Sequence, residues 1–184
     1  SPTLEAQVVN VADEIAYNSH DLDDGLKSGY LNMDDLYEVE LWREIYESIK
    51  IEDREKRIYA CVRMLISRQI EDVIKASQER LIKERIETPE DARNSSTIVD
   101  FSEGMKEKNI KLKDFLMEKL YRHYKVIKMQ EKAKRYIKAL FEIYLSEPKQ
   151  LPPQFVKRIE KDGVKRVVCD YIAGMTDRFA QEEY

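Results

Sequence analysis

The stretch that decides the fold is LEAQVVNVADEIAYNSHDLDDG, residues 4–25. Its apolar side chains recur every three or four residues, which predicts an amphipathic helix. The preceding Ser1-Pro2 is a typical helix start, because a proline at the first helical position has no N–H to leave unsatisfied. Gly25 and Gly29 predict where the helix stops. The apolar residues of this predicted helix are Leu4, Val8, Val11, Ile15, Leu22 and Leu26.

The other side of this helix carries a polar stripe. At about 100° per residue its members fall within about 100° of arc. They are Asp13, Tyr17, His20, Asp21 and Asp24. A solvated acidic face is one interpretation. However, a tyrosine ring in the middle of such a face is more stable when other groups pack on it. The crowded carboxylates also repel one another unless a cation or hydrogen-bond donors lie beside them. The second interpretation is a site for a divalent metal and a sugar, although one or two acids and a histidine do not complete a metal site.

Helical signals continue to the end of the chain and predict an all-α fold, organised as a single helical region over residues 1–184. The helices are expected at 33–50, 52–84, 109–145 with a break near Tyr124, 154–161 and 164–181. Residues 88–108 hold Pro89, three adjacent polar residues and Gly104, so this segment is predicted to be a long loop.

Composition narrows the class of protein. Of the 184 residues, 42% are hydrophobic and 37% charged, and no apolar run reaches the roughly 18 residues that a membrane-spanning helix needs. Five glycines and five prolines are too few for a many-stranded β-fold. The two cysteines, Cys61 and Cys169, cannot form a disulfide framework, so a reducing, cytoplasmic location is expected.

The net charge of −4 conceals a strong change in charge along the sequence, from acidic to basic. Residues 1–50 hold twelve acids and three bases, whereas residues 106–138 hold twelve bases and four acids. The basic stretch is interpreted as a solvated face, as attraction for a polyphosphate, or as a surface for single-stranded nucleic acid assisted by its tyrosines.

Four stretches agree in order and spacing with one family: residues 4–25, IVDFS at 98–102, LKDFL with LYRH inside 112–123, and CDYIAGMTDRFA at 169–180. The chain resembles the deoxyguanosinetriphosphate triphosphohydrolase-like proteins of the HD superfamily. The resemblance implies the C-terminal part of a phosphohydrolase-type HD fold. In the complete enzyme it implies a Mn or Mg ion, hydrolysis of a dNTP such as dGTP to deoxynucleoside and triphosphate, and a homo-oligomer.

The resemblance also implies roles for individual residues of the polar stripe. Asp13 matches the late metal-ligating aspartate of the family. Tyr17 and Asp21 match positions that contact the deoxyribose and its 3′-hydroxyl. One helix would then offer a metal ligand, a sugar platform and a hydroxyl acceptor on successive turns.

A second set of candidate residues lies in LYRH. The resemblance implies that Tyr121 and His123 border the nucleotide pocket, whereas a histidine on a helix surface is the plain alternative for His123. Arg122 and Lys119 are substrate-binding candidates only because cations favour a nearby triphosphate. The Asp170–Arg178 part of the last motif is expected to serve helix packing, a subunit contact or substrate binding.

The adjacent His20-Asp21 pair is not the metal-binding doublet of the family. In the family that doublet and an earlier histidine lie upstream of the aspartate that Asp13 matches. We therefore expect a C-terminal portion that lacks those ligands, does not retain the metal and is inactive alone. The alternative function is a helical oligomerisation or interaction module, with single-stranded nucleic acid bound through residues 106–138.

Overall fold

A computed structural model describes residues 1–184, and every regular element in it is a helix. The prediction of an all-α fold is confirmed. The chain divides into two compact units, Ser1–His123 and Tyr124–Tyr184. Each unit closes its own hydrophobic cluster, and the two clusters have no residue in common.

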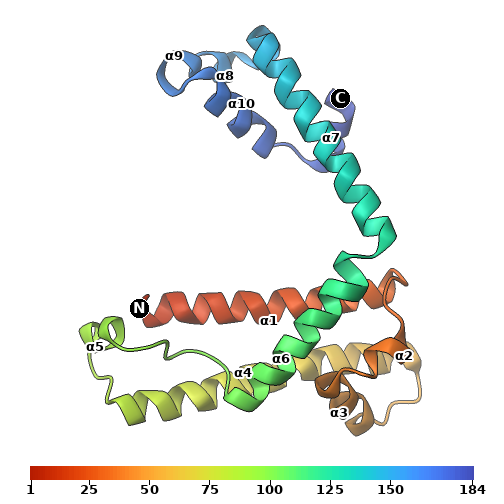
Figure 1. Ribbon diagram of the computed structural model, residues 1–184, viewed down its shortest axis with the longest axis vertical. Coiled ribbons are helices and arrows are strands. Elements are labelled where there is room, and N and C mark those ends of the chain that lie inside the picture. Colours follow the sequence, from red (N-terminus) through yellow and green to blue (C-terminus); the bar gives the residue numbers. More distant parts are fainter. The chain divides into compact units, whose positions relative to one another are not determined.

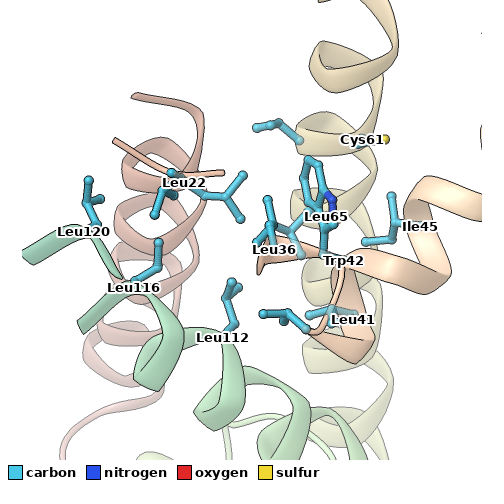
Figure 2. Packing of buried hydrophobic residues seen from close by; sticks show 13 residues of the cluster. Leu22, Leu36, Leu41, Trp42, Ile45, Cys61, Leu65, Leu112, Leu116 and Leu120 are labelled. Atoms are coloured by element: carbon cyan, nitrogen blue, oxygen red, sulfur yellow. The ribbon is translucent and has the colours of Figure 1, made fainter. Parts of the chain in front are cut away.

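The first unit is built on two long helices that lie side by side, with a third crossing them (Figure 1). Its elements are α1 (Leu4–Lys27), α2 (Met33–Leu36), α3 (Glu40–Ser48), α4 (Arg54–Glu84), α5 (Pro89–Asn94), α6 (Glu103–Leu116) and the π-helical turn η1 (Met117–Tyr121). Its core surrounds the fully buried Trp42, with Leu36 and Leu65 beside the indole ring (Figure 2).

Helix α1 ends at Lys27, inside the predicted stop signal. Its N-cap is Thr3, whose hydroxyl accepts a hydrogen bond from the Ala6 N–H, and not Ser1. The predicted apolar stripe is only partly buried, because Ile15 and Leu22 are buried while Val8 is 51% exposed. A polar row takes the remaining buried positions: Gln7, Asn18 and Ser19.

Two predicted segments are wrong in detail. Residues 88–108 are not a loop throughout, since Thr88 and Asp91 form a capping box that begins α5 and Ser102 caps α6. The predicted helix 33–50 is two helices, α2 and α3, with an interruption after Leu36.

The IVDFS motif lies between α5 and α6 outside any helix, and side chains from α1 and α4 bond to its backbone. Gln7 Oε1 accepts hydrogen bonds from the Ile98 and Val99 N–H groups at 2.8 and 2.9 Å. Arg80 donates to the carbonyls of Ile98, Asp100 and Phe101. The motif therefore joins the ends of the two long helices.

The second unit packs one long helix against short ones. Its elements are α7 (Tyr124–Ser146), the 3₁₀ turn η2 (Pro148–Gln150), α8 (Pro153–Val156), α9 (Ile159–Asp162), α10 (Val164–Ala173) and α11 (Asp177–Glu183). The break near Tyr124 is confirmed. The predicted helices 154–161 and 164–181 are each divided in two; in the second, Gly174 follows α10 and Thr176 caps α11. No helix in either unit is long and apolar enough to cross a membrane.

Candidate functional site

The first unit brings together three residues of the predicted site that lie far apart in sequence. The Tyr121 hydroxyl donates a hydrogen bond to Oδ2 of Asp21, across a separation of 100 residues. The Tyr17 and Tyr121 rings stack with centroids 6.0 Å apart and an interplanar angle of 23°. A carboxylate and two aromatic rings therefore form one cluster, which we call the tyrosine–aspartate cluster.

A local departure from α-helical geometry includes Tyr121 as its last residue. The chain turns from α6 into η1, where the Arg122 N–H bonds to the Met117 carbonyl at 3.2 Å. Such π-turns are rare and occur frequently at functional sites. The turn gives Leu120 a buried position in the core beside α1, and Tyr121 follows it directly.

The η1 turn can pack here because the side chains of Leu31 and Leu120 approach Gly25 closely. A Cβ atom at Gly25 would lie 2.6 Å from Leu31 Cδ1 and 3.2 Å from Leu120 Cδ1. The glycine carbonyl also accepts hydrogen bonds from the Tyr30 and Leu31 N–H groups. The missing side chain at Gly25 lets both the loop after α1 and the η1 turn pack against the helix that carries Tyr17 and Asp21.

The electrostatics of the cluster keep Tyr121 protonated. Burial, together with the hydrogen bond to Asp21, raises the pKa of the Tyr121 phenol well above its usual value of 10. The hydroxyl is therefore a permanent donor at neutral pH. The Tyr121 hydroxyl bonds to Oδ2 of Asp21, and Oδ1 can accept a hydrogen bond from a ligand hydroxyl.

Asp13 lies two turns before Asp21 on the same helix and is exposed. Because its carboxylate is exposed, its oxygens can ligate a cation. No group of three or more His, Cys, Asp or Glu side chains in the chain could hold a metal ion. Asp13 is therefore a candidate for a single metal ligand and not part of such a group. Tyr17, one turn on, is 55% exposed, so its ring has a free face.

The other candidates have different surroundings. His123 stacks on Tyr30 with centroids 4.7 Å apart and an interplanar angle of 16°. Lys119 pairs with Asp35 of α2 at 3.8 Å, and Arg122 is exposed beyond the π-turn. Sequence reasoning missed Tyr30, which no periodicity or motif singled out.

The basic stretch 106–138 is divided between the two units. In the first unit, Lys106, Lys108, Lys111 and Lys113 pair with acids of α1, α3 and the IVDFS motif. Ion pairs within the fold therefore already neutralise much of that positive charge. The interpretation as a nucleic-acid surface rests on the bases of α7.

The Asp170–Arg178 stretch has a packing role in the second unit. Asp170 accepts a hydrogen bond from Arg158 at 2.5 Å and pairs with Arg166 at 2.8 Å. The Arg158 guanidinium holds the pKa of the Asp170 carboxyl below its ordinary value. Arg178 pairs only with Glu182, one turn away on α11.

Comparison with known proteins first identifies the class. Residues 99–184 match the family model described as a phosphohydrolase-associated domain, which begins in the IVDFS motif and includes the whole second unit. The class is thus that of helical proteins with a phosphohydrolase-associated domain.

Individual relatives give a more specific comparison than the family model does. The chain is 50% identical over its whole length to a deoxyguanosinetriphosphate triphosphohydrolase-like protein of Geobacter metallireducens, and it covers 49% of that protein. It is 47% identical to one of Geobacter sulfurreducens and 38% identical to one of Leptospira interrogans, again with full coverage of this chain. These matches agree with the family resemblance stated from the sequence: the chain is similar over its whole length to deoxyguanosinetriphosphate triphosphohydrolase-like proteins. The chain spans about half the length of the curated relatives it matches.

Proposed function

We propose that this chain carries the sugar-binding side of a deoxynucleoside triphosphate triphosphohydrolase site. The reaction in the complete enzyme would be hydrolysis of a dNTP, with dGTP the first candidate, to the deoxynucleoside and inorganic triphosphate. The observation that carries the proposal is the tyrosine–aspartate cluster, because the fold joins Tyr17 and Asp21 to Tyr121, which the family resemblance had placed in the same pocket.

The cluster suits a deoxyribose. The exposed Tyr17 ring offers a flat apolar face for the sugar. The second oxygen of Asp21 accepts the hydrogen bond of the 3′-hydroxyl. Tyr121 fixes the first oxygen and so aims the second, which makes Tyr121 a positioning residue in this proposal.

Asp13 would supply one ligand to a Mn or Mg ion, whose chemistry is to polarise the phosphate and activate water. Since no metal-binding group is complete within residues 1–184, the remaining ligands would come from outside them. We therefore expect the isolated chain to release no triphosphate from dGTP. The family resemblance supports a homo-oligomer, and two free cysteines suit the reducing cytoplasm.

The test uses a chimera in which this chain replaces the matching half of the Geobacter metallireducens relative. Triphosphate release from dGTP is measured with Mn or Mg. Asp13→Ala should abolish turnover, and Asp21→Asn should raise the KM by at least about tenfold, since a charged hydrogen bond contributes roughly 1.5–3 kcal/mol. Glu5→Gln is the matched control, because Glu5 is exposed on the same helix outside the polar stripe and should leave turnover unchanged.

Two results would contradict the proposal. Turnover that survives Asp13→Ala would remove Asp13 from the site. Robust hydrolysis by residues 1–184 alone would show that the metal set is not shared with another part of the polypeptide.

A further inference from the structure

An apolar groove of about 640 Å³ runs between α1 and α4 in the first unit. Its floor includes the buried Ile15 and Val73, and its walls include Val8, Ile70 and Ile74, which are 51%, 43% and 53% exposed. The polar side chains on its lining are His20, Ser77 and Gln78. A contiguous apolar surface of this kind marks an interaction site.

The groove has the form of a helix-docking surface. Ile66, Ile70 and Ile74 follow one another at intervals of four residues along α4 and form a ridge. On α1, Leu4 and Val8 have the same spacing, and the row continues through Ala12 and Ala16. Small residues in the middle of the α1 row leave room for the backbone of another helix to approach.

The length of the relatives indicates what covers this groove. The chain matches only 49% of the Geobacter metallireducens relative, so that protein contains a second half of similar size. The groove of this chain is an apolar surface without a partner, although Ile15, Val73 and Val99 already form a cluster at its floor. A further helical layer would continue this cluster outward.

The position of the groove on α1 also favours a segment from the other half of the polypeptide as its occupant. Its row of Ala12, Ala16 and His20 runs beside Asp13, which follows Ala12 directly. A segment docked here would approach the exposed Asp13 carboxylate. This step alone rests on the proposed function, because that function requires further ligands near Asp13.

We propose that the α1–α4 groove is the surface on which the other half of the relatives' polypeptide packs, with an apolar helix seated between Val8 and Ile74. The occupant is therefore a segment of the same protein, and not a second copy of this chain or a small ligand.

The experiment compares one substitution in two contexts, residues 1–184 alone and the chimera of relative length. Ile74→Asp places a charge in the groove. The matched control is Ile82→Asp, the same change two turns later on α4, where Ile82 is 79% exposed and outside the groove. Thermal unfolding and the fluorescence of an apolar dye are measured for each protein.

In residues 1–184 alone, Ile74→Asp should move the Tm by no more than about 2 °C and should lower the dye fluorescence, because the side chain is exposed there. In the chimera, the dye should bind weakly before any substitution, and Ile74→Asp should lower the Tm by roughly 5–10 °C, because the charge becomes buried. Ile82→Asp should change little in either context.

Equal effects of Ile74→Asp in the two contexts, or a chimera that binds dye as strongly as the chain alone, would overturn the proposal. A concentration-dependent dimer of residues 1–184 that Ile74→Asp dissociates, with no extra cost in the chimera, would assign the groove to a second copy and would also overturn it. Asp13→Ala separates the two proposals, because turnover tests the proposed function whereas Tm and dye fluorescence test the groove. The variant should leave the Tm and the dye fluorescence of the chimera unchanged, whatever its effect on turnover.

Discussion

The Tyr121 hydroxyl donates its hydrogen bond to Oδ2 of Asp21, while the Tyr121 ring stacks on Tyr17, one turn before Asp21 on α1. One side chain thus contacts both sugar-binding candidates of α1. Because burial keeps the Tyr121 phenol protonated, the hydrogen bond persists across the neutral pH range. The carboxylate of Asp21 is therefore oriented before any ligand arrives.

Tyr121→Phe should keep the stacked ring and remove only the hydroxyl. Asp21 then rotates freely, so kcat/KM for dGTP in the chimera should fall about fivefold to tenfold, which corresponds to the roughly 1 kcal/mol of a typical hydrogen bond. The control is Tyr59→Phe, because Tyr59 is 59% exposed on α4 and outside the cluster. Steady-state kinetics on both variants decide the matter. An unchanged kcat/KM for Tyr121→Phe would mean that Asp21 is held by other contacts or does not bind the sugar.

Gly25→Ala should disturb the same cluster without touching any of its members. The new methyl group would lie within 3.2 Å of both Leu31 and Leu120, so the η1 turn must shift. We expect a loss of about 1–3 kcal/mol of unfolding free energy, as for overpacked cores. Gly104→Ala is the matched control, since it meets no atom within 4 Å in α6 and should stabilise by about 0.5 kcal/mol.

Urea unfolding of residues 1–184 measures both glycine variants. Opposite signs would confirm that the close approach at Gly25, and not the loss of glycine itself, carries the effect. Two stabilised variants would show that Leu31 and Leu120 can move aside at no cost.

The helical class and the limits of α1 and α4 could be predicted from the sequence, because apolar periodicity and terminal glycines act locally. The division into two units could not, since it depends on which clusters share residues in space. The π-turn that ends at Tyr121 was equally hidden: its i+5 hydrogen bond leaves the spacing in the sequence unchanged.

The candidate site shows the same contrast. The stripe of Asp13, Tyr17 and Asp21 follows from helix geometry, but the partner of Asp21 follows only from the fold. The periodicity also marked Val8 as a core residue, whereas it is half exposed. Periodicity identifies an apolar face but not what covers it, and that distinction underlies the groove proposal.

Arg80→Met should destabilise the first unit. The Arg80 guanidinium donates to three carbonyls of residues 98–101, and methionine keeps the length of the stem without any donor. The carbonyls are left unsatisfied, so we expect a loss of about 2 kcal/mol or more in urea unfolding. Arg63→Met is the control on the same helix, because Arg63 is exposed, and it should cost no more than about 0.5 kcal/mol. A small effect of Arg80→Met would indicate that water replaces the guanidinium.

The ion pair between Arg158 and Asp170 should make the second unit sensitive to acid. Arg158 lowers the pKa of Asp170 from its ordinary value of 3.8, so the folded pKa lies below the unfolded one. The stabilisation is therefore complete above about pH 5, and it is lost as the pH falls through the folded pKa. Asp170→Asn should accelerate hydrogen exchange of the α10 amides at pH 7, and the difference from the unsubstituted chain should shrink steadily below about pH 4. Glu160→Gln, an exposed acid on α9, should show no such difference at either pH. A gap between Asp170→Asn and the unsubstituted chain that stays constant down to pH 3 would mean that Asp170 acts through packing, because a neutral asparagine and a protonated aspartate would then differ for reasons other than charge.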